Sequence, residues 1–157
     1  MPRVTATNRN IDVLRVVIIA GLIGEVIFEL YAHLVSPALF GPALEPANLV
    51  MALSTKLFGI SIPYSIAFPI HFVIGSVGFG IFVYIAMRLV SRNPLISGGL
   101  SGVALWFIAQ GMLAPFIGRS FMMDFGPYTQ SSFIGHVGMS IIIAYAIVAQ
   151  NRGHPES

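Results

Sequence analysis

The 157-residue sequence contains no cysteine, and charged residues make up only 9% of it. Without cysteine the chain forms neither disulfides nor thiolate metal sites. Its net charge of +2 is too small to indicate a nucleic-acid partner, and no basic cluster is present that would bind a phosphate backbone. The motifs of nucleophilic, phosphoryl-transfer and zinc-protease enzymes are also missing, which disfavours a catalytic role.

Apolar residues dominate instead: 56% of the chain is hydrophobic, and its mean hydropathy is +0.86. These values indicate an integral membrane protein. Four stretches are long and apolar enough to cross a bilayer, at about 13–35, 66–90, 94–117 and 130–149. Each must be helical, because lipid offers the backbone no hydrogen-bond partner. The predicted fold class is therefore an all-α four-helix bundle, with residues 1–157 forming a single transmembrane domain.

The positive residues predict the orientation of this bundle. In a four-span arrangement Lys56 and Arg119 fall on one side of the membrane, and six arginines fall on the other. These six are Arg3, Arg9, Arg15, Arg88, Arg92 and Arg152. Positive residues accumulate on the cytoplasmic side, so both termini are expected in the cytoplasm. The expected location is the inner (cytoplasmic) membrane of the cell. The connection 36–62 then lies outside, and residues 46–60 are candidates for a short helix along the membrane surface.

The two halves of the chain share a short repeated sequence pattern. "GLIG" at 21–24 is followed, thirteen residues after its last glycine, by Pro37, and "GLSG" at 99–102 has Pro115 at the same distance. Each of these helices leads into a helix with a single histidine. The pattern is compatible with two duplicated hairpins related by an axis along the membrane normal. It is equally compatible with glycine spacing that serves helix packing alone.

The first span carries three polar side chains, Glu25, Glu29 and His33, at spacings of four residues. That spacing places them on one stripe of a helix. A charged side chain at the bilayer centre costs about 2.5–3.5 kcal/mol on insertion scales. We therefore expect the stripe to face the interior of the bundle.

The other spans each offer a polar side chain at a similar depth in the outer half of the membrane: His71, Gln110 and His136. The sequence thus predicts a buried cluster of glutamate and histidine. Three states of its carboxylates remain open at this point: protonation, pairing with an imidazolium, or coordination of a metal ion.

Three chemical uses of this cluster are compatible with the sequence. His71 and His136, facing one another diagonally, would be the ligand pair for a b-type haem cofactor. Glu29, His33, His71 and His136 offer nitrogen and oxygen ligands for a divalent metal. Glu25, Glu29 and His33 are typical proton-handling groups at graded depth. A fourth interpretation is structural, because intramembrane histidines are often hydrogen-bonded packing residues.

Two segments resemble the YagU-type group of small four-span inner-membrane proteins: "HFVIGSVGFGIFVYIAMRLVSRNPLISGGLSGVALWFIAQGMLAPFIG" (71–118) and "SSFIGHVGMS" (131–140). The similarity lies in a histidine that opens a glycine-rich second helix, a third helix with tryptophan and a late Pro-x-x-Gly, and a Gly-His pair in the fourth. The shared positions would be His71, Gly75, Trp106, Pro115, Gly118 and His136. The group's third helix tends to carry a histidine after the tryptophan, whereas Gln110 or Gly111 stands here. The resemblance implies an inner-membrane location and an association with acid tolerance.

Short loops leave this chain little surface of its own for a water-soluble substrate. The sequence therefore favours a non-catalytic accessory subunit of a larger inner-membrane respiratory or redox complex. Its expected partners are the lipid bilayer and other membrane subunits or further copies of the chain. The alternative is a stand-alone protein that uses the cluster, either as a bis-histidine haem b protein or to conduct protons or metal ions.

Overall fold

The computed structural model describes the backbone of residues 6–152 and the side chains of residues 12–150; within this range the chain is helical and has no strand. Eight α-helices follow one another along the described chain: α1 Ala6–Leu30, α2 Ser36–Phe40, α3 Ala47–Phe58, α4 Tyr64–Val73, α5 Gly80–Leu89, α6 Pro94–Phe107, α7 Ala114–Phe116 and α8 Pro127–Arg152. A single 3-10 turn, Phe121–Phe125, precedes α8. The all-helical prediction is confirmed.

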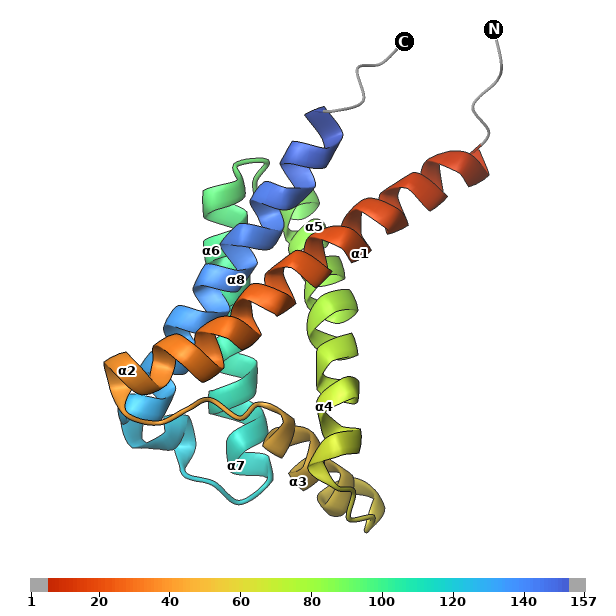
Figure 1. The fold of residues 1–157 in the computed structure, drawn as a ribbon. Helices are drawn as coiled ribbons and strands as arrows, with labels where there is room; N and C mark the ends of the chain where they lie inside the picture. Colours follow the sequence, from red (N-terminus) through yellow and green to blue (C-terminus); the bar gives the residue numbers. More distant parts are fainter. Residues whose placement is uncertain (1–5, 153–157) are drawn as a thin grey trace, which may run out of the picture.

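Three π-helical segments join most of these helices into long rods (Figure 1). Tyr31–Val35 joins α1 to α2 in a first rod, Ile74–Phe79 joins α4 to α5 in a second, and Ile108–Leu113 joins α6 to α7 in a third. Helix α8 is the fourth rod. The long connection between the first two rods contains α3, at the place where a short helix was expected.

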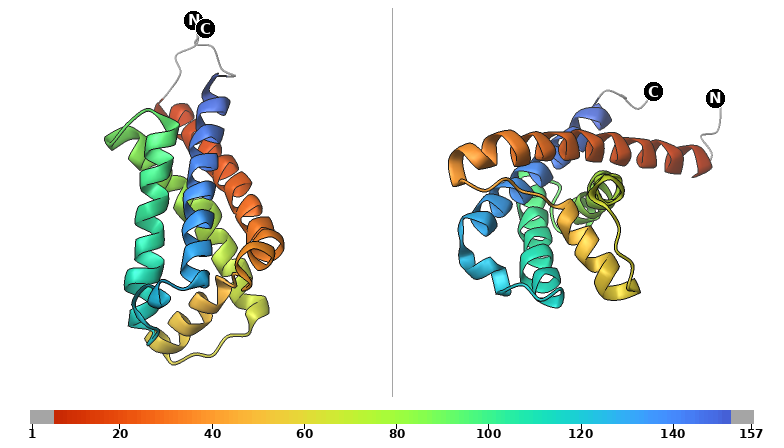
Figure 2. Two further views of the ribbon diagram at one scale, coloured as in Figure 1. Left: turned by 90° about the vertical axis from the view of Figure 1, so that its left-hand side faces the viewer. Right: turned by 60° about the horizontal axis from the view of Figure 1, so that its bottom comes forward.

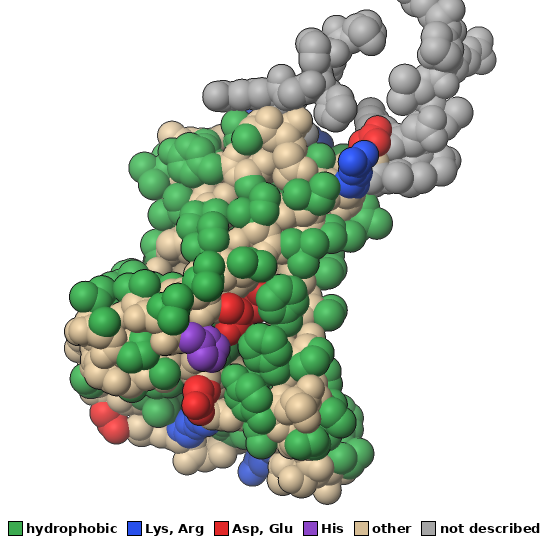
Figure 3. Space-filling view, in the orientation of Figure 1, with side chains coloured by type: hydrophobic (Ala, Val, Ile, Leu, Met, Phe, Trp, Pro, Cys, Tyr) green, Lys and Arg blue, Asp and Glu red, His purple; other side chains and the backbone are tan. Residues whose placement is uncertain are grey.

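Three of the rods are long and apolar enough to cross a membrane, over Tyr64–Leu89, Pro94–Phe116 and Pro127–Gln150. They match three of the four predicted spans to within three residues at each end. The first rod, whose side chains are described only from residue 12 on, is not among them, and its crossing of the membrane stays a prediction. Hydrophobic side chains cover much of the outside of the bundle (Figure 3), which is the surface expected of a protein surrounded by lipid. The chain is thus a candidate membrane protein with a helical bundle.

The first rod crosses the bundle obliquely and packs against both the second rod and α8 (Figures 1 and 2). The third rod packs along α8. The second and third rods form a hairpin around a short turn, in which the Asn93 side chain accepts hydrogen bonds from the backbone N–H groups of Leu95 and Ile96. This cap satisfies donors that a helix start leaves free. The beginning of α1 and the end of α8 lie at the same end of the bundle, and α3 and α7 lie at the other.

Glycines set the closest contacts between the rods. A Cβ at Gly21 would overlap the backbone carbonyl of Ser76 in the second rod, and one at Gly98 would overlap the backbone of α8 around Ile141. Small residues let helix backbones approach closely, which is a main source of helix association in membranes. Glycine contacts therefore hold the first rod against the second, and the third rod against α8.

The first rod extends past Pro37, beyond the predicted end of its span, and stops at Phe40 before Gly41, whose φ is 90°. A proline inside an α-helix clashes with the carbonyl four residues earlier, here that of His33. His33 lies within the π-helical segment Tyr31–Val35, where the regular ladder is already interrupted. The π segment thus accommodates the proline, and the helix continues.

Candidate metal centre

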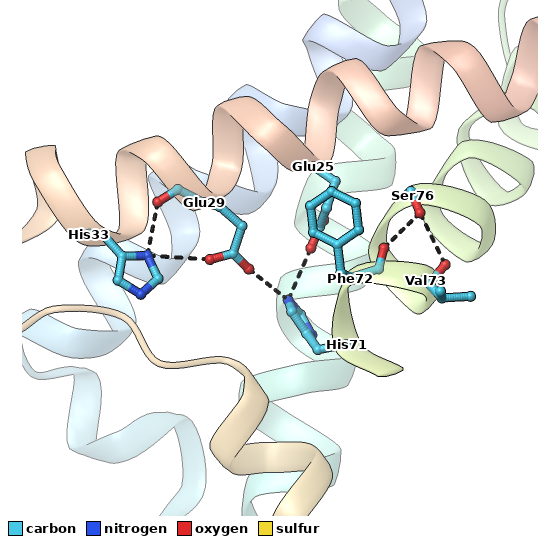
Figure 4. Close-up of polar contacts among 7 residues, drawn as sticks. All are labelled: Glu25, Glu29, His33, His71, Phe72, Val73 and Ser76. Carbon is cyan, nitrogen blue, oxygen red and sulfur yellow. Dashed lines mark hydrogen bonds and ion pairs between the residues drawn. The ribbon is translucent and has the colours of Figure 1, made fainter. Parts of the chain in front are cut away.

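Four polar side chains from two rods form a connected row (Figure 4). Glu25 and Glu29 of α1 and His33 of the following π segment lie on one side of the first rod, and His71 of α4 faces them. The Nε2 atom of His71 lies 3.2 Å from Glu25 Oε1 and 3.6 Å from Glu29 Oε1. The second oxygen of Glu29, Oε2, lies 3.3 Å from His33 Nδ1. Glu29 therefore bridges the two histidines.

The two ends of this row differ in exposure. The side chain of His33 is 45% exposed, those of His71 and Glu29 are 12% and 11% exposed, and that of Glu25 is 1% exposed. Glu29 and His33 also line a surface groove between the first rod and α4, beside Tyr64. On the space-filling surface, acidic and histidine side chains interrupt the otherwise apolar face near its middle (Figure 3). The row thus leads from the surface to a fully buried carboxylate.

The buried end of the row is short of hydrogen-bond partners. Among the described residues, both carboxylate oxygens of Glu25, both of Glu29, and Nε2 of His71 are buried and make no hydrogen bond. Two neighbouring carboxylates in an apolar medium repel one another and are both poorly solvated. One imidazole N–H satisfies at most one of the four oxygens. The cluster therefore requires a cation or protons between its carboxylates.

The spacing of these atoms suits a metal ion. One ligand atom from each of Glu25, Glu29 and His71 can be chosen so that all three lie within 4.8 Å of one another. Ligands at zinc-like distances in a tetrahedral site lie roughly 3.4 Å apart. The two distances from His71 Nε2, 3.2 and 3.6 Å, bracket that value. Two carboxylates and one imidazole also leave a fourth position open, as in catalytic or exchangeable metal sites.

Local features of both rods hold the cluster in place. Gly75 lies directly against the Glu25 carboxylate, where a Cβ would overlap it. The Ser76 hydroxyl donates to the carbonyl of Phe72 at 2.6 Å, a local bond that competes with the regular helix ladder (Figure 4). This serine lies inside the π-helical segment that begins three residues after His71. The resemblance named Gly75 among its shared positions, but the sequence did not predict that Gly75 lies against the side chain of Glu25.

The three π-helical segments all lie beside polar side chains. His33 lies within the first, the second follows His71, and Gln110 lies within the third. Such segments are rare in proteins and occur frequently at functional sites. Sequence reasoning missed them. In the first and third rods, a proline could have indicated the π-helical segment. Pro37 and Pro115 each follow such a segment by two residues.

His136 of α8 lies apart from the metal centre. Its Nδ1 atom lies 2.8 Å from the backbone carbonyl of Ser132, one helical turn earlier. The ring of Phe28 packs near both histidines, with centroid distances of 6.4 Å to His71 and 5.6 Å to His136. The structure confirms a buried histidine at this position.

The predicted site residues are therefore divided between two places. Of the four residues predicted as metal ligands, Glu29 and His71 lie together with Glu25. His33 joins them through Glu29, and His136 lies elsewhere. The three residues predicted to handle protons lie in one row. The two residues of the predicted haem pair, His71 and His136, both pack near Phe28 and line one cavity, and haem binding stays a prediction.

Comparisons with known families, with characterised proteins and with solved structures found no match for this chain. The resemblance to the YagU-type group therefore stays a prediction.

Proposed function

We propose that this protein spans the membrane four times and binds one divalent metal ion at Glu25, Glu29 and His71. The observation that carries the proposal is the set of buried, unpartnered ligand atoms from two rods at metal-ligand spacing. A mixed nitrogen and oxygen ligand set suits zinc, manganese or ferrous iron better than magnesium or calcium, which prefer oxygen ligands alone. His33, exposed and bonded to Glu29, is then the residue that an incoming ion meets first.

The site opens to one side of the bundle only. Beyond Glu25, towards the ends of the chain, Gly21 packs against the backbone of Ser76, and Gly80 packs against that of Val17. The cationic side chains Arg88 and Arg92 line a pocket at that end and repel metal ions. These features support capture of an ion from the α3 side in preference to an open channel.

Metal binding is tested on the purified protein in lipid nanodiscs. Native mass spectrometry counts the bound ions, and titration calorimetry with zinc and manganese gives the affinity. We expect one ion per chain, and an affinity reduced by more than about 100-fold in Glu25→Gln and Glu29→Gln, since loss of an outer-shell partner alone costs 10–100-fold. Glu45→Gln, the same change in an exposed glutamate of the outer loop, is the matched control. Equal affinities in all three variants would refute the site.

A second candidate use of the same atoms is storage of a proton shared by Glu25 and Glu29. The same unpartnered oxygens favour it, because a shared proton also removes the repulsion between them. Infrared difference spectra would then show a protonated carboxyl group in the metal-free protein that disappears in Glu25→Gln. Protein that binds no metal yet shows this band would replace the metal proposal with a proton site.

The orientation is part of the proposal. The common end of α1 and α8, together with six arginines against two basic residues, supports a cytoplasmic location for both termini. Since the chain has no cysteine, a thiol reagent reacts only with a cysteine that is introduced by mutation. In intact cells a membrane-impermeant maleimide should label Ser61→Cys but not Ser91→Cys; the reverse pattern would invert the orientation.

The role of accessory subunit in a respiratory or redox complex also stays a prediction. Many apolar side chains on the outside of the bundle are free to meet either lipid or a partner. A stoichiometric protein partner, or a bound haem, would appear in the same native mass spectra. Either species would be found whether or not the metal site is occupied.

A further inference from the structure

A second buried site lies on the other side of His71. A partly open cavity of about 160 Å³ lies between Phe28 of the first rod, the second and third rods, α3 and α8. Most of its wall is apolar. The polar side chains on this wall include His71, Gln110, Ser132 and His136.

Two of these side chains carry a hydrogen-bond acceptor for which the described residues supply no partner. Gln110 donates from Nε2 to the Ser132 hydroxyl at 3.2 Å, which leaves its Oε1 atom buried without a partner. In His136, Nδ1 lies 2.8 Å from the carbonyl oxygen of Ser132, an atom that only accepts. The hydrogen of a neutral imidazole is therefore on Nδ1, and Nε2 is the acceptor. No hydrogen bond of the described residues involves that Nε2 atom.

The size of the cavity restricts its occupant. A cavity of about 150 Å³ lined by leucine, isoleucine and phenylalanine side chains holds one benzene ring. The cavity here is of that size, is flanked by Phe28 and Phe79, and adds two acceptors. A single six-membered ring that carries hydroxyl groups matches both the volume and the acceptors.

The apolar residues of α3 beside the cavity favour a ligand whose ring carries an apolar tail. Helix α3 contributes Leu49, Val50 and Leu53 to the cavity, and its outer part carries exposed Leu57 and Phe58. An alkyl chain attached to the ring would meet apolar surface along α3. A water-soluble phenol would gain nothing from that surface.

We propose that this cavity binds the ring of a lipid-soluble hydroquinone, with its hydroxyl groups donating to His136 and Gln110 and its alkyl chain lying along α3. This site is independent of the proposed metal function, although the imidazole of His71 borders both places. Hydrogen bonds to the two acceptors discriminate the reduced ring from analogues that lack hydroxyl donors.

The test uses decyl hydroquinone and its dimethyl ether, which has the same ring and tail but no donor. Binding to the full-length protein in nanodiscs is measured by saturation-transfer NMR and calorimetry, with empty nanodiscs as the baseline for partition into lipid. We expect one hydroquinone per chain, and an affinity for the ether that is lower by about tenfold or more. Equal affinity for both compounds would overturn the proposal.

Three variants locate the site. Gln110→Met and His136→Leu each remove one acceptor at similar size, and each should weaken hydroquinone binding by about tenfold. Gln130→Met changes an exposed glutamine and should leave the affinity unchanged. Ala109→Phe fills the cavity from its wall and should abolish binding even if an acceptor variant fails to fold.

The metal site provides the last control. Glu25→Gln should retain full hydroquinone affinity, because Glu25 is not part of the cavity wall. A chain that binds metal but no hydroquinone overturns this inference alone, and a chain that binds hydroquinone but no metal overturns the proposed function alone. Full binding in Ala109→Phe would show that the probe sits elsewhere and would refute the cavity as its site.

Discussion

The two buried histidines of the bundle differ in what their ring nitrogens face. His71 directs Nε2 at the carboxylates of Glu25 and Glu29, and Glu29 also pairs with His33. His136 bonds its Nδ1 to a carbonyl of its own helix and borders a mostly apolar cavity, whose wall also includes Arg119. One histidine thus belongs to a charged cluster that is incomplete by itself, and the other to a hydrogen-bonded network. The contrast teaches that residue type and depth in the membrane do not fix a histidine's role; the side chains opposite it do.

The largest expected effect separates the two histidines directly. His71→Ala should lower metal affinity by more than about 100-fold, because it removes a direct ligand. His136→Leu should change it by less than about threefold, since His136 contacts neither carboxylate. Calorimetry with zinc on both variants measures the difference. An equal loss in both would mean that the two histidines act on one site.

The second prediction concerns the cost of the charged cluster. In metal-free protein, the double change Glu25→Met and Glu29→Met should raise the free energy of unfolding by about 1–4 kcal/mol, as when buried ionic groups elsewhere are replaced by apolar ones. Ser132→Ala should lower it by about 1–3 kcal/mol, because the buried amide of Gln110 loses its acceptor. Denaturant titration in detergent micelles measures both. Destabilisation by the double change would mean that the carboxylates stabilise the fold.

The third prediction tests the close glycine contacts of the first rod with the second rod and of the third rod with α8. Gly21→Ala and Gly98→Ala should each lower the free energy of unfolding by about 1–3 kcal/mol, because the new Cβ meets backbone atoms. Gly99→Ala has open space and should raise it by about 1 kcal/mol. Thermal unfolding followed by circular dichroism compares the three. If Gly98→Ala matched Gly99→Ala, the close contact between the third rod and α8 would be wrong.

The smallest effect tests the support of one carboxylate. Gly75→Ala should reduce metal affinity by about tenfold, because its Cβ displaces the carboxylate of Glu25, a movable group at the end of a flexible side chain. Gly78→Ala, in the same π-helical segment but with space for a methyl group, should leave the affinity unchanged. The same zinc titration measures both. Equal affinities would show that Glu25 is not held against Gly75.

Much of the fold could be predicted from the sequence. The apolar stretches at 66–90, 94–117 and 130–149 correspond to rods within three residues at each end, because backbone groups in an apolar stretch must bond within a helix. The end of the first rod was less predictable. Pro37 indicated a stop, yet a π-helical segment absorbs it, and whether a helix breaks or bulges at proline depends on the neighbours that satisfy the freed backbone groups.

The candidate site was predictable in part. The spacing of Glu25, Glu29 and His33 placed them on one stripe, and helix geometry alone ensures that they lie in a row. Which partner they meet was not available from spacing. His71 faces the stripe, whereas His136 bonds to a carbonyl of its own helix. The cavity beside Gln110 gave no signal in the sequence, since it arises where four rods and α3 fail to fill the space between them.

The sequence by itself determined that the chain is helical, apolar on its surface and polar along one stripe, because hydrophobic length and helical periodicity act within single segments. The tertiary structure decided which histidine meets the carboxylates, where the glycines let the rods touch, and where a ring-sized cavity remains. Those features depend on the rotation and crossing of helices far apart in the chain, which are set by packing between them.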